Sequence, residues 1–437
     1  MLKVAKFGGS SLADAVQYRK VKDIIERDPA RTVVVVSAPG KRTSDDHKIT
    51  DLLYLCEAHL KYGVSFDDIY EMICSRYLEI RNDLGLKIDL ETEFAELRRE
   101  MRHGISRDEI VSRGEYFSAR LMAAYLGYEF IDAKLWLTFN LDGTVDTDKS
   151  YELLRIAAEG RKVVIPGFYG VMPDGHIRLM DRGGSDITGA LAAAALDADV
   201  YENWTDVSGI LMADPRIVPN AKTIDRVTYS ELRELSYIGA QVLHEASIFP
   251  VRRKNIPLNI RNTNEPDHPG TMIQEYFTEE LPDSSFITGL AGRKGFSIIT
   301  ITNSGMSSKV DSLRRIVEIF EKYNVTISYA PTGIDCFSAV VENQQLDSRK
   351  YAVLAELQKE LKPDDITVTE QIAVLAVVGR RMISRSGSSG RIFEALGENG
   401  INIRMISQGP EELNIIIGVK EADFNPAIRV IYENFVD

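Results

Sequence analysis

The first residues that could bind a ligand or take part in catalysis lie in the sequence Lys6-Phe7-Gly8-Gly9-Ser10-Ser11, which combines a lysine with two glycines. The apolar residues 2–7 predict a short strand, and a helix is expected to begin near Leu12. A strand that ends in a Gly-Gly turn at a helix N-terminus forms an anion site, because backbone N–H groups approach a ligand closely and the helix dipole favours negative charge. We therefore expect this loop to bind phosphate groups, such as those of ATP. The alternative is that the glycines only end a strand and that Lys6 is a solvated lysine.

Three more glycine loops follow predicted strands or begin predicted helices. They are residues 166–170, residues 182–186 (Arg-Gly-Gly-Ser-Asp) and residues 205–209 (Thr-Asp-Val-Ser-Gly). In an open parallel sheet such loops gather at the carboxyl edge of the strands, where ligands bind. The pair Gly40-Lys41 imitates the end of a P-loop, but the first glycine of that motif would fall at Val35, inside a strand, so we exclude a P-loop.

The elements that must position these loops alternate between strands and helices. Residues 15–26 show helical periodicity, and residues 32–38 form an apolar run typical of a strand buried on both faces. Residues 50–126 are expected to be largely helical, and further strands are predicted at residues 162–166, 199–203, 257–261 and 271–274. This order indicates βαβ units and an α/β fold with an open, largely parallel sheet.

The last third of the chain contains an internal repeat, in which Met306 aligns with Met382. Each copy reads strand, turn, helix, strand, strand, which is a ferredoxin-like βαββ plan present twice. The first copy comprises residues 296–302, 311–322, 325–330 and 337–342, and the second comprises residues 372–378, 389–398, 401–407 and 413–419. The acidic, proline-containing residues 278–285 predict a linker. We therefore predict domains at 1–280, 286–365 and 366–437, and leave open whether the last two exchange strands.

Length and charge narrow the class of protein. A chain of 437 residues predicts two or three domains, and a net charge of −13 disfavours non-specific nucleic-acid binding. Cys56, Cys74 and Cys336 have no metal-ligand spacing and predict reduced thiols in a cytoplasmic protein. No apolar run reaches membrane-spanning length, and Lys3 and Lys6 interrupt any signal region, so we expect no membrane partner.

Several motifs occur together in an order that resembles the signature set of the aspartokinases. They are Lys6-Phe7-Gly8-Gly9-Ser10-Ser11, Arg113-Gly114-Glu115, Arg182-Gly183-Gly184-Ser185-Asp186, Thr205-Asp206-Val207-Ser208-Gly209-Ile210 and Asp214-Pro215-Arg216. The repeat resembles the tandem ACT regulatory domains of the same family. The resemblance implies a three-layer αβα amino acid kinase domain followed by two ACT domains. It also implies transfer of the γ-phosphoryl group of ATP to the side-chain carboxylate of L-aspartate, the first step towards lysine, threonine and methionine.

The resemblance assigns roles to individual residues. Lys6 would neutralise charge on the transferred phosphoryl group, and Asp186 would either orient Lys6 or help to hold the metal–nucleotide, unless it is only a helix cap. The implied nucleotide side comprises Lys6, Gly8, Gly9, Ser10, Thr205, Asp206 and Arg216, with phosphate oxygens on the Gly8 and Gly9 amides. The implied aspartate pocket comprises Ser37, Thr50, Glu115, Arg182, Gly183, Gly184 and Ser185.

Within that pocket Arg182 would bind a substrate carboxylate and Glu115 the substrate ammonium, the alternative for Glu115 being a solvated helix residue. Asp206 and Asp214 are open to a simpler interpretation as turn residues. We expect Mg²⁺ between the β- and γ-phosphates, ligated mostly by phosphate and water, without a dedicated protein metal site.

Two departures from the family pattern concern the nucleotide side. Leu211 stands where many relatives have Tyr, and Gln241 stands where they have Lys, so the adenine contacts could differ. These departures keep two alternatives open, a catalytically weak amino-acid sensor and a related amino-acid kinase with another acceptor.

The repeat also carries an implied effector site. Met306, Ser307, Ser308 and Asp311 lie in a turn that binds an amino acid in the resembled domains, and Ser328 lies on the opposing strand. Ser328 stands where lysine-sensing relatives often carry Asp, so lysine is the first hypothesis and threonine the second. The resemblance implies a homodimer or a dimer of dimers through the ACT domains, and the alternative is a purely structural or dimerising tail.

Overall fold

The structure is a computed structural model that describes residues 1–181, 183–239, 245–277, 287–304, 311–382, 386–409 and 413–436. The chain divides into two compact units. The first comprises Met1–Ile210, Thr223–Tyr229 and Val242–Phe277, and the second comprises Leu211–Lys222, Ser230–Gln241 and Thr278–Asp437. Two segments within the predicted domain 1–280 therefore cluster with the second unit.

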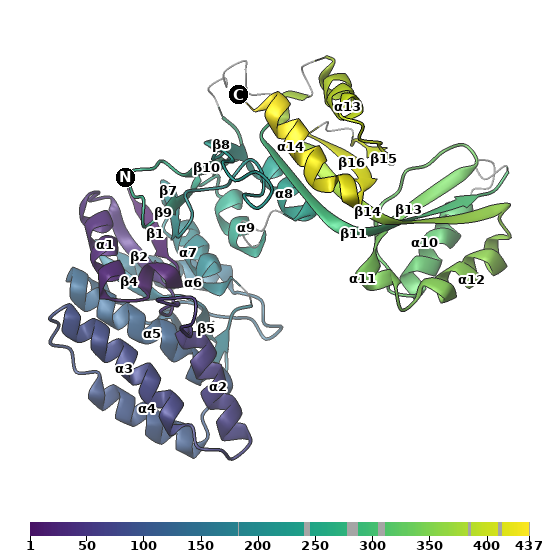
Figure 1. The fold of residues 1–437 in the computed structure, drawn as a ribbon. Coiled ribbons are helices and arrows are strands. Elements are labelled where there is room, and N and C mark those ends of the chain that lie inside the picture. Colours follow the sequence, from purple (N-terminus) through teal and green to yellow (C-terminus); the bar gives the residue numbers. More distant parts are fainter. Residues whose placement is uncertain are drawn as a thin grey trace. The chain divides into compact units, whose positions relative to one another are not determined.

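The first unit is built on an eight-stranded sheet with the order β3-β4-β2-β1-β7-β9-β10-β8 (Figure 1). The six strands from β3 to β9 are parallel, β10 is antiparallel to β9, and β8 is parallel to β10. The strands are β1 (Lys3–Phe7), β2 (Arg31–Val36), β3 (Glu129–Phe130), β4 (Val163–Pro166), β7 (Val200–Thr205), β8 (Arg226–Thr228), β9 (Leu258–Asn262) and β10 (Thr271–Gln274). The sequence did not predict strand β8. It also did not predict a separate hairpin, which is formed by β5 (Tyr169–Val171) and β6 (Ile177–Leu179).

Helices cover both faces of this sheet, which confirms the predicted three-layer fold class. The four valines that end β2 are at most 1% exposed, as the apolar run predicts for a strand covered on both sides. One face packs on α1 (Ala15–Glu26), α2 (Ile49–Lys61), α3 (Asp67–Asp83), α4 (Glu91–His103) and α5 (Arg107–Leu126). The other carries α6 (Thr147–Ala158), α7 (Gly184–Ala195) and α9 (Glu245–Arg253), with short helices η1 (Gly9–Leu12) and η2 (Ala133–Leu135) completing the unit.

Helix α7 begins inside the predicted glycine loop at residues 182–186. Its first residue is Gly184, because Gly183 takes a left-handed conformation (φ 83°) that starts the helix. Ser185 and Asp186 therefore lie in the first helical turn. The helix can pack closely because Ala190 and Ala192–Ala195 are fully buried.

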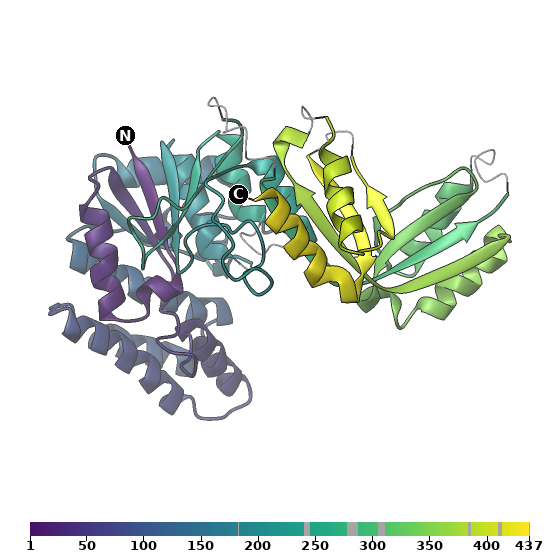
Figure 2. The same ribbon diagram turned by 45° about the horizontal axis from the view of Figure 1, so that its top comes forward.

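The second unit contains a six-stranded sheet with the order β12-β13-β11-β14-β16-β15 (Figure 2). Its strands are β11 (Gly289–Thr302), β12 (Ile327–Tyr329), β13 (Cys336–Glu342), β14 (Asp365–Val378), β15 (Met405–Ser407) and β16 (Asn414–Lys420). Strands β11 and β14 pair antiparallel along their whole length, with register shifts near Phe296. Gly295 (φ 88°) and Gln371 (φ 56°) lie at this irregularity.

Each half of this sheet has its own core and its own helices. Ile299, Ile301 and Ile366 pack in one core, and Leu290, Leu375 and Val377 in the other, so β11 and β14 each serve both. The helices are α10 (Ser312–Lys322), α11 (Asn343–Leu346), α12 (Lys350–Leu361), α13 (Ser388–Glu398) and α14 (Phe424–Phe435), with α8 (Tyr229–Ile238), η4 (Arg380–Met382) and η5 (Glu421–Asp423). The predicted strand–helix–strand–strand order is found in both copies. Each copy also ends in a helix that was not predicted, α12 in the first copy and α14 in the second.

In the described part of the chain, no helix is both long and apolar enough to cross a membrane.

Candidate active site

A cavity of about 1310 Å³ lies in the first unit, where loops leave the carboxyl ends of β1, β2 and β7. It brings together residues that are far apart in the sequence. The predicted site residues that line it are Lys6, Gly8, Gly9, Ser10, Ser37, Thr50, Glu115, Gly183, Gly184, Ser185, Asp186, Thr205 and Asp206. Arg182 lies outside the described residues, so its predicted contact with a carboxylate stays a prediction.

Lys6 forms an ion pair at the first turn of α7. Its Nζ is 2.5 Å from Oδ1 of Asp186, and its side chain is only 8% exposed. Asn203, which faces Lys6 across the β1–β7 register, accepts from Lys6 Nζ at 3.4 Å and donates from Nδ2 to Asp186 Oδ1 at 3.0 Å. The sequence analysis missed Asn203. Its only sequence signal was its place beside the Thr205–Asp206 motif.

The position of Asp186 excludes one of its predicted roles. Gly183 occupies the N-cap of α7, which has no side-chain cap hydrogen bond, so Asp186 is not a helix cap. Its backbone carbonyl accepts from the hydroxyl of the buried Tyr201 at 3.0 Å, while its carboxylate pairs with Lys6. The predicted roles of orienting Lys6 and of holding the metal–nucleotide stay predictions.

The glycines after β1 differ in what they contribute. The N–H of Gly8 donates to the carbonyl of Trp204 at 3.0 Å, so the expectation that this amide holds a phosphate oxygen is wrong. This N–H group already joins the ends of β1 and β7 through its hydrogen bond to Trp204. The N–H groups of Gly9 and Ser10 have no acceptor within the described residues and remain available for an anion.

Gly9 also allows two loops to touch through their backbones. The N–H of Gly40 donates to the carbonyl of Gly9 at 2.8 Å. A Cβ on Gly9 would lie 2.8 Å from the carbonyl oxygen of Ala38, and one on Gly40 would lie 2.7 Å from the carbonyl carbon of Gly9. This close backbone contact, and not a P-loop, is the reason why a glycine is needed at position 40.

Glu115 is a buried carboxylate on α5 with one unpaired oxygen. Its Oε1 accepts from the N–H of Ala38 at 3.1 Å, whereas the buried Oε2 has no partner. Burial raises the pKa of Glu115 to about 8, because no cation compensates the cost of desolvating the charged form. The site can therefore bind a ligand that brings a positive charge to this oxygen, and the alternative of a solvated helix residue is wrong.

The loop before α7 completes this side of the cavity. Phe168 has φ 76°, and its N–H donates to the Thr188 hydroxyl at 3.0 Å. A Cβ on Gly184 would lie 2.4 Å from the Phe168 ring. These close contacts fix the N-terminus of α7, whose backbone dipole favours an anion at Gly184 and Ser185.

Thr205 and Asp206 line the cavity at the end of β7. The Thr205 hydroxyl donates to Asp206 Oδ1 at 3.1 Å, and the Thr205 carbonyl accepts from the N–H of Thr263 at 2.9 Å. Arg216 is different, because it belongs to the second unit, its side chain is 88% exposed, and it pairs with Asp214. Hydrogen bonds from Arg216 lower the pKa of Asp214. The predicted nucleotide contact of Arg216 stays a prediction, as does the effect of Leu211, and Gln241 lies outside the described residues.

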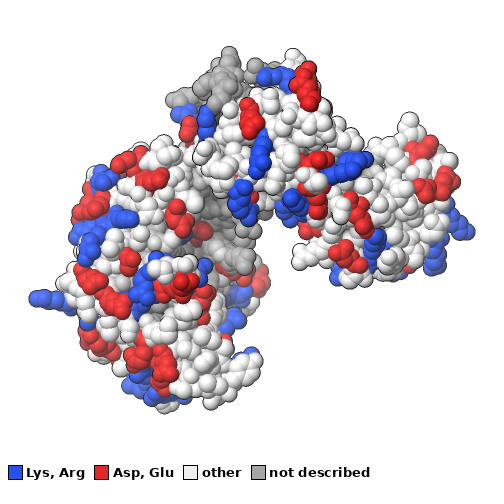
Figure 3. All heavy atoms as spheres, viewed as in Figure 1, with Lys and Arg blue, Asp and Glu red and all other residues white. Residues whose placement is uncertain are grey.

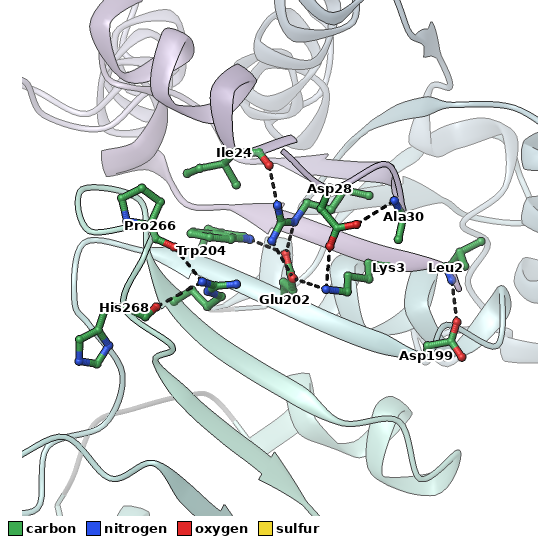
Figure 4. Close-up of polar contacts among 12 residues, drawn as sticks. Leu2, Lys3, Ile24, Asp28, Ala30, Asp199, Glu202, Trp204, Pro266 and His268 are labelled. Carbon is green, nitrogen blue, oxygen red and sulfur yellow. Dashed lines mark hydrogen bonds and ion pairs between the residues drawn. The ribbon is translucent and has the colours of Figure 1, made fainter. Parts of the chain in front are cut away.

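A buried polar network supports the other face of β1 and β7 (Figure 4). Glu202 is 2% exposed and accepts from Arg31 Nε at 2.7 Å, from Trp204 Nε1 at 2.9 Å and from Lys3 Nζ at 3.4 Å. Burial works against ionisation of Glu202, but the hydrogen bond and charge of Arg31 lower its pKa below the usual value. The Trp204 ring stacks on Phe7, and Arg261 lies 4.6 Å from the ring centre. The network therefore holds the strand ends that carry Lys6, Asn203 and Gly8.

The predicted effector residues are only partly described. Met306, Ser307 and Ser308 lie outside the described residues. Asp311 precedes α10 and pairs with Arg314 and Arg315, which lower its pKa, and Ser328 lies in β12. Their role in binding an effector stays a prediction.

The comparisons with known proteins agree with this architecture. The model of the amino acid kinase family matches residues 1–262, and that of the ACT domain matches residues 375–435. Aspartokinase 3 of Bacillus subtilis is 35% identical over 451 residues, which cover 99% of this chain and 98% of the relative. The chain belongs to the aspartokinases.

Solved structures of aspartokinases have the same fold. The aspartate kinase of Clostridium acetobutylicum is 46% identical with a TM-score of 0.91 and covers 99% of each chain. Aspartokinase III of Escherichia coli, crystallised with aspartate and ADP, is 25% identical with a TM-score of 0.71 over all of both chains. The ACT identity predicted for the repeat is confirmed.

Proposed function

We propose that this protein phosphorylates the side-chain carboxylate of L-aspartate with ATP, giving 4-phospho-L-aspartate and ADP. The observation that carries the proposal is the unpaired, buried Oε2 of Glu115 in the same cavity as the Lys6–Asp186 pair. The first feature suits an amino-acid ammonium, and the second suits a transferred phosphoryl group. The Escherichia coli relative was crystallised with aspartate and ADP, which supports aspartate and an adenine nucleotide as the two ligands.

The acceptor needs no general base, because a carboxylate is already ionised at neutral pH. Catalysis then depends on alignment and on stabilising charge in the transition state. Lys6 neutralises charge on the phosphoryl oxygens, and Asp186 with Asn203 fixes its Nζ. The amides of Gly9 and Ser10 hold phosphate oxygens without reorganising.

The amino acid is held by the two charged groups on its α-carbon. Glu115 pairs with the ammonium group. Ser37 and Thr50 line the cavity, and the α7 N-terminus at Gly184 and Ser185 favours a carboxylate. The length of the side chain then selects aspartate over glutamate, since the acceptor carboxylate has to meet the phosphoryl group in line.

Magnesium fits this donor set as a substrate-bound ion. The described residues contain no group of three or more His, Cys, Asp or Glu side chains that could hold a metal. Asp186 is engaged by Lys6 and Asn203, whereas Asp206 receives only the Thr205 hydroxyl. Mg²⁺ commonly keeps several waters and takes one or two carboxylates beside phosphate oxygens, so Asp206 would hold it. The ion would neutralise charge on the β- and γ-phosphates.

A coupled assay of ADP release tests the function, with aspartate, glutamate or no acceptor. We expect turnover that depends on aspartate, and the Lys6→Ala variant should lose about two to four orders of magnitude in kcat. Lys61→Ala, an exposed lysine at the end of α2, is the matched control and should behave as wild type. Equal turnover with glutamate would indicate a related kinase, and no turnover with any acceptor would indicate a sensor.

We further propose that an amino acid, lysine before threonine, inhibits through the ACT repeats, and that the repeats form a dimer. The repeated ACT plan and the two short edge strands β12 and β15 support these proposals. Adding each amino acid to the coupled assay and to a thermal-shift measurement tests the effector. Analytical ultracentrifugation tests the dimer. A cytoplasmic location is also proposed, and the free thiols of Cys56, Cys74 and Cys336 support it.

A further inference from the structure

A buried arginine lies against the loop that joins β2 to α2, which we call the β2–α2 loop (residues 37–48). Arg76 is on α3, its side chain is only 5% exposed, and it does not line the cavity. Neither the sequence motifs nor the predicted site includes it. Because removing a guanidinium from water is costly, the contacts that compensate Arg76 show which parts of the chain it holds in place.

One nitrogen of this guanidinium contacts two loops at the edge of the sheet. Nη1 of Arg76 donates to the carbonyl of Gly40 at 3.2 Å and to the carbonyl of Ala13 at 3.5 Å. Ala13 directly follows η1, the short helix that contains Gly9 and Ser10. Arg76 therefore links the β2–α2 loop to the segment that follows β1.

Gly40 lies directly against the backbone of Gly9 and Ser10. Its N–H donates to the Gly9 carbonyl at 2.8 Å. A Cβ on Gly40 would lie 2.7 Å from the carbonyl carbon of Gly9 and 2.9 Å from the backbone nitrogen of Ser10. A shift of the Gly40 backbone therefore also moves the two N–H groups that are available for an anion.

Asp46 holds Arg76 in this position. Nη2 of Arg76 donates to both carboxylate oxygens of Asp46 at 2.7 Å, and Asp46 also accepts from Arg42 Nε at 3.0 Å. Burial opposes ionisation of Asp46, but hydrogen bonds from Arg42 and the charge of Arg76 lower its pKa below the ordinary value. Arg42 is 41% exposed and stays beside Asp46 when Arg76 is replaced, so such a variant leaves no carboxylate without a cation.

The proposed aspartate pocket is held by other contacts. The N–H of Ser37 donates to the Phe7 carbonyl at 3.1 Å, and the N–H of Ile49, next to Thr50, donates to the Pro39 carbonyl at 3.1 Å. Neither bond involves the guanidinium. The two ends of the β2–α2 loop therefore keep their places when the guanidinium is removed.

We propose that Arg76 is a positioning residue for the phosphate groups of the nucleotide. It acts through the carbonyl of Gly40 on the amides of Gly9 and Ser10, and the inference rests on the proposed function. Fixed amides bind an anion better than mobile ones, because binding does not then have to order them. Residues 41–45 and 47–48 are exposed, so the pair of Arg76 with Asp46 is the anchor of the middle of this loop.

The test uses the full-length protein with Arg76→Met, which removes the guanidinium and keeps a flexible side chain that can stay buried. The Kd for ADP, measured by calorimetry, and the KM for ATP should rise about tenfold, whereas the KM for aspartate should change less than twofold. Arg76→Lys keeps the charge and should recover part of the ADP affinity. Asp46→Asn keeps the shape of the carboxylate and should raise the Kd for ADP about threefold, which gives a second test if Arg76→Met does not fold.

Tyr70→Phe is the matched control on the same helix. It removes the buried hydrogen bond from the Tyr70 hydroxyl to the Phe94 carbonyl (2.8 Å), on the side of α3 that faces α4. This variant should lose stability and keep the wild-type Kd for ADP and KM for ATP.

A role limited to stability predicts a different result. Arg76→Met would then unfold at a lower temperature with wild-type values for the nucleotide, and that outcome overturns the proposal. Equal increases in the KM values for ATP and aspartate, or the same increase in Tyr70→Phe, would also overturn it, since the effect would not be specific to the phosphate-binding amides. Failure of the proposed function is separate, because it would show as absence of aspartate-dependent ADP release in the wild type.

Discussion

Replacing Glu115 by Gln separates recognition of the amino acid from phosphoryl transfer. Gln has the same shape and keeps an oxygen that accepts the N–H of Ala38, now 3.1 Å from Oε1. It replaces the unpaired Oε2 by a neutral NH₂ group. The variant therefore loses the partner of the substrate ammonium and little else.

The size of the effect follows from the kind of contact that is lost. A hydrogen bond to a charged group contributes about 1.5–3 kcal/mol, which corresponds to roughly a tenfold to 150-fold increase in the KM for aspartate. The KM for ATP should stay within about twofold, because the proposed function places Glu115 at the amino acid and not at the nucleotide. Glu100→Gln, an exposed glutamate on α4, is the control and should change neither value.

The raised pKa adds a pH dependence with a defined sign. Because burial raises the pKa of Glu115 to about 8, the free protein is mostly protonated there at pH 7, and pairing with the ammonium requires ionisation. In the wild type, kcat/KM for aspartate should therefore rise from pH 7 towards pH 8.5, and this rise should be absent from Glu115→Gln.

The same shift predicts an effect on stability. Between the ordinary glutamate pKa of 4.5 and the raised pKa of about 8, the folded protein binds a proton at Glu115 that the unfolded chain has lost, so the free energy of unfolding falls as pH rises through this window. At about 1.36 kcal/mol per pH unit the upper bound is ~5 kcal/mol. Glu115→Gln should thus resist urea better than wild type at pH 8 and equally at pH 4.5. An unchanged KM for aspartate in the variant, or a wild-type kcat/KM that does not vary with pH, would refute the assignment.

Three further predictions concern the loops and the network behind them. Gly9→Ala should lower kcat at least about tenfold, because its Cβ would lie 2.8 Å from the Ala38 carbonyl oxygen. Gly8→Ala should be tolerated, because the nearest atom to its Cβ would be 3.5 Å away. Similar losses of kcat in both variants would contradict the importance of the backbone contact. Asn203→Ala should reduce kcat about tenfold with ADP affinity unchanged in calorimetry, because it frees Lys6 and Asp186 to move. Glu202→Gln should destabilise the fold by about 3–5 kcal/mol in urea unfolding at pH 7, since it leaves the buried Arg31 unpaired, and a loss below ~1 kcal/mol would show that the network is dispensable.

Charged side chains of both signs lie on the surface. On the face shown in Figure 3, Lys and Arg are interspersed with Asp and Glu in both units. The net charge of −13 disfavours non-specific nucleic-acid binding, which stays a prediction. Binding of a nucleotide then depends on single groups such as Lys6 and on backbone amides.

The order of residue types along the chain was enough to predict the sheet and the edge at which the candidate site lies. An apolar run such as Val33–Val36 has to be buried on both faces, and glycine loops after parallel strands have to meet at one edge, whatever the details of packing. The roles of Lys6, Asp186 and Glu115 came from motif resemblance, because spacing alone does not say which carboxylate faces a cation.

The pairing of those groups could be seen only in the folded chain. Asn203 lies in a strand, and its sequence gives no sign that the β1–β7 register places it opposite Lys6. The amide of Gly8 is used by Trp204, and the contact of Gly9 with Gly40 joins loops that are 31 residues apart in the chain. Such pairings depend on strand order and register, which act between residues that are distant in sequence. Leu211–Lys222 is the clearest case, since Ile217 packs in the core under α14 and the segment clusters with the second unit although it directly follows the Thr205–Ile210 motif.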